Sequence, residues 1–145
     1  MRIYDPVAGG EALVVLEGHG RYVRALTVFE APVTGGLCLA SGSSDGPVRV
    51  WDLAAGGAAL FVLEGHTSNV YALTAFADPA TGETRLASAG SYFDKTLRVW
   101  DASKGTALRV VAFDDEVWAL AVRSDTTGLF VASGNRWGEL RMGSS

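Results

Sequence analysis

The stretch "LASAGSYFDKTLRVWD" at residues 86–101 decides the fold, because most of it occurs twice in the chain. An earlier stretch, "LASGSSDGPVRVWD" at residues 39–52, matches it with two residues fewer. Both open on Leu-Ala-Ser, carry an aspartate in the middle and end on Arg-Val-Trp-Asp. Self-similarity at a fixed spacing indicates a protein built from structural repeats.

The similarity extends upstream of both stretches. "VLEGHGRYVRALTVF" at residues 15–29 matches "VLEGHTSNVYALTAF" at residues 62–76, and a weaker third copy covers residues 116–142. Equivalent valines lie 47 residues apart, at Val23, Val70 and Val117. We therefore divide the chain into three repeats at about 11–52, 58–101 and 106–142, preceded by a partial strand at 2–5, and interpret residues 143–145 as an artificial tail.

Short β-branched runs fill each repeat, and Gly, Asp, Asn, Ser or Thr residues separate them. Such runs, without a helical period, are typical of strands of about five residues joined by tight turns. In the second repeat we expect strands near 70–76, 85–88, 97–100 and 107–112. Four strands per repeat make one small antiparallel sheet, so the sequence predicts an all-β protein.

The order of these residues resembles the WD40 repeat: Gly-His, Val-x-x-Leu, Leu-Ala-Ser, Asp, and then Val-Trp-Asp. That family has a GH…WD signature and four strands per blade of a β-propeller. The resemblance is strong in two repeats and weaker in the third, and it implies three propeller blades. It also implies a non-catalytic scaffold for protein–protein interaction, because the family works mainly as a rigid platform for proteins and peptides.

Both ends of the chain lie inside the repeat. "RIYD" at residues 2–5 resembles "RVWD" at 98–101, and "LRM" at 140–142 resembles "LRV" at 97–99. Three blades are too few for a ring, because propellers have four to eight. Either missing blades of a longer protein or a second copy closes the ring, and for the chain as given we expect a homodimer with six blades.

Two sets of Ser, His and Asp invite comparison with a hydrolase. An enzyme needs one such set beside an oxyanion hole, whereas here two sets recur at the repeat period, and each is followed by a tryptophan. In WD40 proteins the equivalent residues form a buried hydrogen-bonded tetrad in which the chain runs from Trp through Ser and His to Asp. The resemblance implies the tetrads His19, Ser41, Asp45, Trp51 and His66, Ser88, Asp94, Trp100.

The third repeat departs from this pattern. Phe113 stands at the histidine position and Trp137 at the aspartate position, and Ser133 alone is kept. We therefore expect the third blade to lack a tetrad. We assign the arginines in the third strand of each repeat no role beyond covering apolar surface with their stems; these are Arg49, Arg98 and Arg141.

In this family, partners usually bind the face that carries the turn before the first strand of each repeat and the turn between its second and third strands. Carried onto this chain, that face would hold aromatic, arginine and polar residues of the types that dominate interface hot spots. The positions are Tyr22, Arg24, Ser44, Asn69, Tyr71, Phe93, Glu116, Trp118 and Arg136. An alternative is a pocket for a sugar or a modified lysine, lined by Tyr71, Phe93, Trp118 and Trp137.

The composition of the chain excludes several classes of binding partner. The net charge is −4 and there is no basic run, which argues against nucleic acid, and no apolar stretch is long enough to span a membrane. No metal cluster and no phosphate-binding loop is evident, so we expect no metal and no cofactor. The single cysteine, Cys38, cannot form an internal disulfide; we expect it to be buried, and the protein to be intracellular, in the cytoplasm.

Overall fold

The computed structural model describes residues 1–32, 34–91, 93–113, 119–125, 128–134 and 140–144; the last three ranges are described by their backbone, with Leu120 in full. The described residues form strands joined by turns and loops, as the sequence predicts. No described segment is a helix with the length and apolarity that a membrane span requires.

Two sheets of four antiparallel strands dominate the molecule. The first blade contains β3 (Val23–Glu30), β4 (Leu37–Ser43), β5 (Val48–Asp52) and β6 (Phe61–Leu63). The second contains β7 (Val70–Ala77), β8 (Thr84–Gly90), β9 (Thr96–Asp101) and β10 (Thr106–Ala112). In each blade every strand pairs with the next one along the chain, which is the order that tight turns impose.

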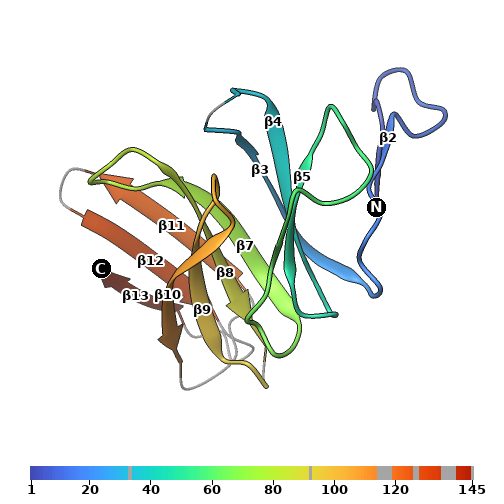
Figure 1. Ribbon diagram of the computed structural model, residues 1–145. Coiled ribbons are helices and arrows are strands. Elements are labelled where there is room, and N and C mark those ends of the chain that lie inside the picture. The colour runs from blue at the N-terminus through green and yellow to red at the C-terminus, as the bar shows by residue number, and fades with distance from the viewer. Residues whose placement is uncertain (33, 92, 114–118, 126–127, 135–139, 145) are drawn as a thin grey trace.

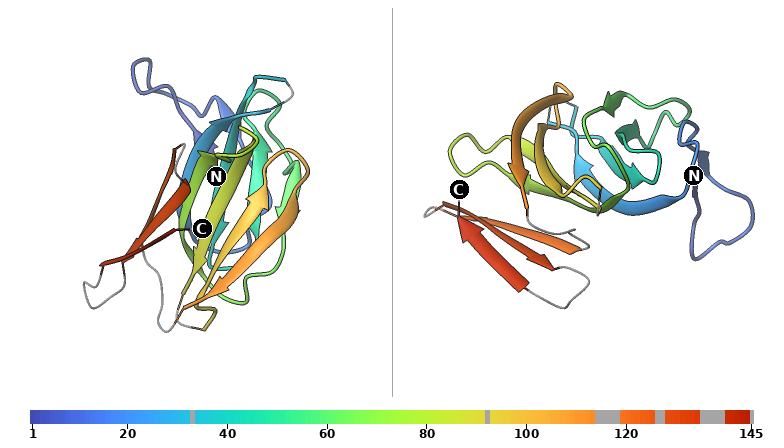
Figure 2. Two further views of the ribbon diagram at one scale, coloured as in Figure 1. Left: turned by 90° about the vertical axis from the view of Figure 1, so that its left-hand side faces the viewer. Right: turned by 90° about the horizontal axis from the view of Figure 1, so that it is seen from below.

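Two smaller sheets flank these blades. The pair β1 (Arg2–Ile3) and β2 (Val14–Val15) precedes the first blade. The third blade contains β11 (Ala119–Asp125), β12 (Gly128–Gly134) and β13 (Leu140–Ser144), again in chain order. Residues 143 and 144 pair with β12 in this sheet, although we interpreted them from the sequence as part of an artificial tail. Strand β7 contacts β3 and β4 of the first blade and β11 of the third, so the sheets lie side by side (Figures 1 and 2).

Aspartates at the ends of strands explain several of the turns. Asp52 and Asp101, the last residues of the two "RVWD" stretches, each accept backbone N–H groups two and three residues further along the chain. Asp5 does the same at the N-terminus. An aspartate that bonds the backbone ahead of it favours a turn, so the motif itself ends the strand.

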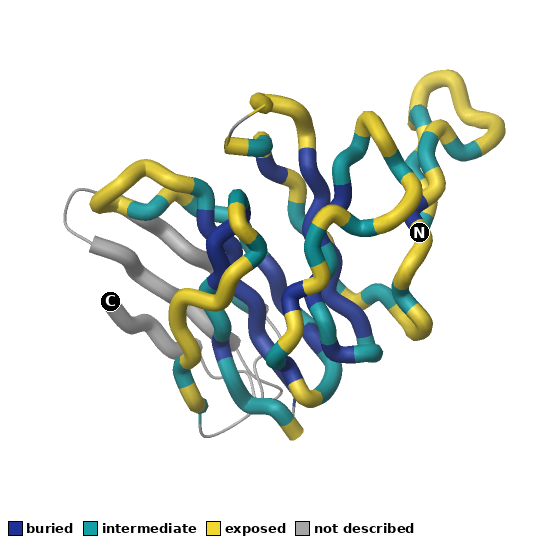
Figure 3. The backbone as a smooth tube through the Cα atoms, viewed as in Figure 1, coloured by how far each residue is buried: buried dark blue, intermediate teal, exposed yellow. Residues whose placement is uncertain are grey.

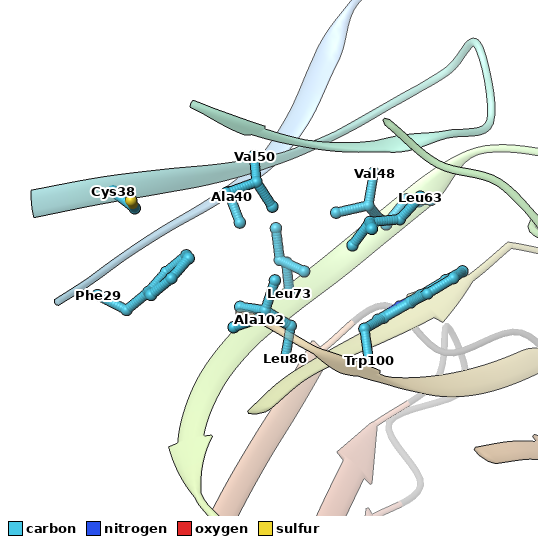
Figure 4. Close-up of a cluster of buried hydrophobic side chains, with 11 residues drawn as sticks. Phe29, Cys38, Ala40, Val48, Val50, Leu63, Leu73, Leu86, Trp100 and Ala102 are labelled. Atoms are coloured by element: carbon cyan, nitrogen blue, oxygen red, sulfur yellow. The ribbon is translucent and has the colours of Figure 1, made fainter. Parts of the chain in front are cut away.

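The core lies mainly between the first and second blades (Figure 4). Phe29, Ala40 and Val50 of the first blade belong to the same buried cluster as Leu73 and Trp100 of the second. Cys38 is 5% exposed and lies in this cluster, as expected for a small apolar residue. Buried residues lie mainly on β4, β5, β8 and β9, whereas β10 and the loops at 31–36 and 78–83 are mostly exposed (Figure 3). The blades are therefore held together face to face by apolar side chains.

Candidate functional site

One end of the blades gathers the predicted site residues. We call it the site face; it carries the segments between β2 and β3, β4 and β5, β6 and β7, and β8 and β9. Equivalent backbone bonds join these segments within each blade: Ser44 N–H donates to the Tyr22 carbonyl, and Ser91 N–H donates to the Asn69 carbonyl, both at 2.9 Å. The same bond in both blades places equivalent side chains at equivalent positions.

A chain of four polar side chains crosses the second blade below this face. The indole Nε1–H of Trp100 donates to Ser88 Oγ at 2.8 Å, and the Ser88 hydroxyl lies 2.6 Å from His66 Nε2. His66 Nδ1 lies 3.0 Å from Asp94 Oδ2, which also accepts the N–H of Thr67 at 2.7 Å. The chain links β8 and β9 to the turns that precede β7 and β9.

The first blade repeats this arrangement. The indole Nε1–H of Trp51 donates to Ser41 Oγ at 2.8 Å, and Ser41 Oγ lies 2.6 Å from His19 Nε2. His19 Nδ1 lies 3.1 Å from Asp45 Oδ1, and Asp45 Oδ2 accepts the N–H of Gly20 at 3.0 Å. The structure therefore brings the eight residues together in two equivalent sets.

The two tetrads hold their histidines neutral. Burial lowers the pKa of His66 below its ordinary value of 6.5, although the charge and hydrogen bond of Asp94 act in the opposite direction. Burial lowers the pKa of His19 in the same way, and the charge of Arg49 adds to the effect. In the second blade a neutral ring lets Nδ1–H donate to Asp94 while Nε2 accepts the Ser88 hydroxyl.

Both aspartates are held in the charged form. Burial alone would raise the pKa of Asp94, but hydrogen bonds from Thr96 and Thr67 and the neighbouring His66 lower that pKa overall. Burial would likewise raise the pKa of Asp45, and the N–H of Gly20 and the ring of His19 reverse the effect. Each tetrad therefore ends in an ionised carboxylate that has its hydrogen-bond donors in place.

Arg49 has a role that the sequence analysis missed. Its Nη1 lies 3.0 Å from Asp45 Oδ2 and 2.7 Å from His19 Nδ1. In the second blade the aspartate instead accepts the hydroxyl of Thr96, two residues further along the chain. The first repeat has Pro47 at that position and so offers no hydroxyl. Because the sequence offers Asp45 no threonine hydroxyl, it indicates that another donor must contact this aspartate, and that donor is Arg49.

The serines of the tetrads are poorly placed for catalysis. Ser41 and Ser88 are 0% exposed, and each hydroxyl oxygen already contacts an indole N–H and an imidazole. A nucleophilic serine must reach a substrate carbonyl. The geometry of these sets is that of a buried network linking strands.

A hollow opens on the site face where the first blade meets the second. Its volume is about 670 Å³, and it is open to solvent. We call it the inter-blade hollow; it is lined by His19, Gly20, Arg21, Tyr22, Arg24, Ser44 and Asn69. Four of these residues, Tyr22, Arg24, Ser44 and Asn69, are among the nine predicted to bind a partner.

Register shifts in the sheets lie at two of the predicted positions. Between β3 and β4 the pairing shifts between Val23 and Ala25, which leaves Arg24 out of register, and between β7 and β8 the same shift leaves out Tyr71. Such irregularities redirect side chains and are common beside binding sites. The guanidinium of Arg24 lies 5.4 Å from the ring centre of Tyr22 and 5.9 Å from that of Tyr71. Two neighbouring blades thus contribute to one cluster.

The remaining predicted positions are spread more widely. Phe93 is 82% exposed in the β8–β9 turn and does not line the hollow. Glu116, Trp118, Arg136 and Trp137 lie outside the described residues. Because the hollow is open and lined mainly by polar side chains, it does not favour the alternative of an enclosed aromatic pocket.

Phe113 occupies the histidine position of the third repeat. It packs with Leu120 against Ala72 and Ala89 of the second blade. At the position where the first two repeats have a tetrad histidine, the third repeat thus has an apolar side chain that contacts the neighbouring blade.

The opposite end of the second blade carries a cluster of charged side chains. Arg85 is 8% exposed, and its guanidinium lies 2.6 Å from Glu83 Oε2 and 3.1 Å from Asp101 Oδ2. Asp78 lies at 3.5 Å. The cluster links the β7–β8 loop to the end of β9. Glu83 therefore forms an ion pair within the protein, whereas a loop residue that only faces solvent forms none.

No group of three or more His, Cys, Asp or Glu side chains in the described part of the chain has the arrangement of a metal site. The described side chains of the site face can form hydrogen bonds, ion pairs and aromatic contacts. These interactions suit recognition of another molecule.

Comparison with known proteins agrees with the architecture. The chain is similar to a solved structure titled "Crystal structure of WD40 beta propeller domain of Doa1", with a TM-score of 0.65 and 28% sequence identity. The match covers 88% of this chain and 38% of that one, so this chain spans well under half of that domain. No curated protein matches the sequence.

The sequence profile of the family described as "WD domain, G-beta repeat" matches residues 10–52 and 57–101. These two matches coincide with the two repeats that hold complete tetrads, and together they span more than half of the chain. The protein therefore belongs to the WD40-repeat family of β-propellers.

Proposed function

We propose that this protein is a non-catalytic scaffold that binds a peptide or protein segment on its site face. The observation that carries the proposal is the inter-blade hollow, which gathers Tyr22, Arg24, Ser44 and Asn69 from two blades. WD40 propellers commonly mediate protein interactions and are typically not catalytic, which supports the proposal. We also propose an intracellular, cytoplasmic location, because the one cysteine is unpaired and buried.

We further propose that a second copy of the chain covers the free face of the first blade. Leu73 of the second blade is 9% exposed because the first blade packs against it. Leu26, the equivalent residue of the first blade, is 54% exposed, and so is Val28. The β1–β2 pair covers Trp51 and Leu39 on that face but does not reach this part of β3.

Strands β11–β13 of a second copy fit this free face by their register. Ala132 pairs with Met142 in the third blade at the position where Ala40 pairs with Val50 in the first. Ala40 and Val50 belong to the cluster that covers Leu73. Repeating the contact between the first and second blades across two copies would give a closed ring of six blades, an ordinary size for a propeller.

The binding proposal can be tested by selecting ligands and then mutating the face. Random peptides displayed on phage would be panned on the immobilised protein, and an enriched peptide synthesised. We expect Tyr71→Ala to weaken its binding by about 2 kcal/mol or more, the scale of interface hot spots. Pro79→Ala, in the exposed β7–β8 loop at the opposite end, should leave the affinity unchanged.

Melting curves of the same variants separate binding from folding. If no peptide is enriched, or if the enriched peptides bind Tyr71→Ala as tightly as the unmodified protein, the proposal is wrong. Glu83→Ala is unsuitable as the control because Glu83 pairs with the buried Arg85.

A further inference from the structure

The inter-blade hollow is positively charged on a protein that is acidic as a whole. The chain has a net charge of −4, yet the hollow is lined by Arg21 and Arg24 and by no acidic side chain. Among the described residues, no carboxylate forms an ion pair with either arginine. Asp45, in the adjoining turn, is already paired with Arg49 at 3.0 Å. The charge of the two arginines is therefore available to a ligand.

Arg24 is held in place before any ligand arrives. Its Nε donates to Ser44 Oγ at 3.1 Å, and its guanidinium lies against the rings of Tyr22 and Tyr71. The register shift at this position sets the direction of the side chain. Because Arg24 is held through Nε and through contacts with the tyrosine rings, both of its terminal nitrogens, Nη1 and Nη2, can donate hydrogen bonds to one ligand.

Two parallel N–H donors fit a group that presents two oxygens. Carboxylates and phosphates accept such a fork in a bidentate manner, and the resulting hydrogen bonds are about twice as strong as neutral ones. A guanidinium is better suited to this geometry than an ammonium group, which is a point charge. Arg21 adds a second positive charge at the same hollow.

The surroundings of Arg24 favour a residue within a peptide over a free anion. Tyr22 is 76% exposed and offers apolar ring surface beside the guanidinium. Ser44 and Asn69 supply hydrogen-bonding groups on either side of the junction between the blades. A chain segment can use all three features at once, whereas an isolated ion uses only the charge.

From this geometry we infer that the inter-blade hollow selects peptide segments that place an acidic side chain, a carboxylate or a phosphate, on Arg24. The inference rests on the proposed function and adds the chemistry of the partner. If the inference is correct, the residues of the first and second blades determine which peptides bind, and the rest of the site face contributes less to this specificity.

The test uses three pools of twelve-residue peptides with random flanks and one fixed central residue: glutamate, phosphoserine or glutamine. Binding of each labelled pool to the intact protein would be measured by fluorescence polarisation. We expect the glutamate pool, the phosphoserine pool or both to bind about tenfold or more tightly than the glutamine pool. The stronger of the two acidic pools identifies carboxylate or phosphate as the preferred group.

Variants connect this preference to the residue. Arg24→Gln should remove the advantage of the acidic pools over the glutamine pool, and Arg24→Lys should restore only part of that advantage. Arg109→Gln, an exposed arginine on β10, is the matched control and should retain the full preference. The advantage should also shrink between 50 mM and 500 mM NaCl, because salt screens exposed charges.

Three results would overturn the inference. Equal binding of all three pools would contradict it while leaving the proposed function intact. A preference for acidic pools that persists in Arg24→Gln would place the charge recognition elsewhere. Failure of every pool to bind would contradict both this inference and the proposed function.

Discussion

Each tetrad depends on one serine hydroxyl that joins an indole to an imidazole. Ser88 Oγ accepts from Trp100 at 2.8 Å and lies 2.6 Å from His66. Removing it leaves two buried polar groups without their partner, and such a group costs about 1–3 kcal/mol. Removing a whole buried tryptophan costs more, because apolar contacts are lost as well.

We therefore predict that Ser88→Ala lowers the free energy of unfolding by about 1–3 kcal/mol. Trp100→Ala should lower it by about 3–5 kcal/mol. Denaturant unfolding measures both, and Glu11→Ala, at an exposed loop position, should change the free energy of unfolding by less than about 0.5 kcal/mol. A Ser88→Ala protein as stable as the unmodified one, or labelling of Ser88 by a serine-directed fluorophosphonate in the folded protein, would contradict the structural role.

The histidines also predict how stability depends on pH. The pKa of each is lower in the folded protein than its ordinary value of 6.5, so below that value the unfolded chain binds more protons than the folded one. The free energy of unfolding should therefore fall as the pH drops through 6.5 towards the folded pKa. The lowered pKa values of Asp45 and Asp94 add a further loss in stronger acid.

His19 and His66 are the two histidines of the sequence, so the slope between pH 7 and pH 5 can be assigned to them. His19→Gln and His66→Gln should each show a shallower slope than the unmodified protein in unfolding experiments across this range. Identical slopes in all three proteins would show that the tetrads do not control this dependence.

The sequence predicted the contacts of side chains that recur in each repeat, but not the contacts of side chains that occur in one repeat. The eight tetrad residues stand at the repeat spacing, and the structure brings them together. Asp45 instead pairs with Arg49, and Pro47 stands where the second repeat has Thr96. An interaction present in one repeat leaves no periodic signal.

At the scale of elements, the first and second blades approach each other closely where β4 meets β7. A Cβ added to Gly42 would lie 2.5 Å from Cγ1 of Val70 and 2.9 Å from its Cβ. No side chain fits there unless the blades separate. The glycine of "LASG" thus allows the blade contact, in addition to any effect on its own strand.

Gly42→Ala should accordingly lower the free energy of unfolding by about 1–3 kcal/mol, the usual cost of overpacking. Gly20→Ala is a matched control, because an added Cβ there meets no atom within 4 Å. In the double variant Gly42→Ala, Val70→Ala, part of the loss should be recovered. Strictly additive losses in this double-mutant cycle would show that the two residues do not compete for the same space.

Strand positions were well predicted because each apolar run is bounded by turn residues. The strands expected near 70–76 and 107–112 are β7 and β10 in the structure. The register shifts at Arg24 and Tyr71 were not predicted, since register depends on the partner strand as well as on the strand itself. Arg24, at one of these shifts, lines the inter-blade hollow, so the placement of its side chain could not be derived from the sequence.

For the whole molecule, the repeats in the sequence predicted one sheet per repeat. The structure shows why equivalent side chains of neighbouring repeats lie on one face of the molecule. The strands of the first and second blades follow the same order, so their equivalent turns and side chains lie on the same face. The extent of the exposed apolar face on β3 could not be predicted, because it depends on how far the β1–β2 pair reaches across Trp51.

That face leads to a prediction about assembly. Light scattering should give a dimer of twice the chain mass of 15.2 kDa at micromolar concentration. Leu26→Asp should convert it to a monomer, since a charge would then face the second copy. Val110→Asp, at a similarly exposed residue on β10, should remain dimeric. A well-folded monomer for the unmodified chain would rule out ring closure by a second copy.

Chemical-shift mapping of backbone amides, with a peptide selected on the protein, locates the surface that a partner contacts. If partners bind where the first and second blades meet on the site face, the largest changes should fall at residues 19–24, 44 and 69–71. Changes confined to the loops at 31–36 and 78–83, on the opposite end of the blades, would contradict binding at the site face.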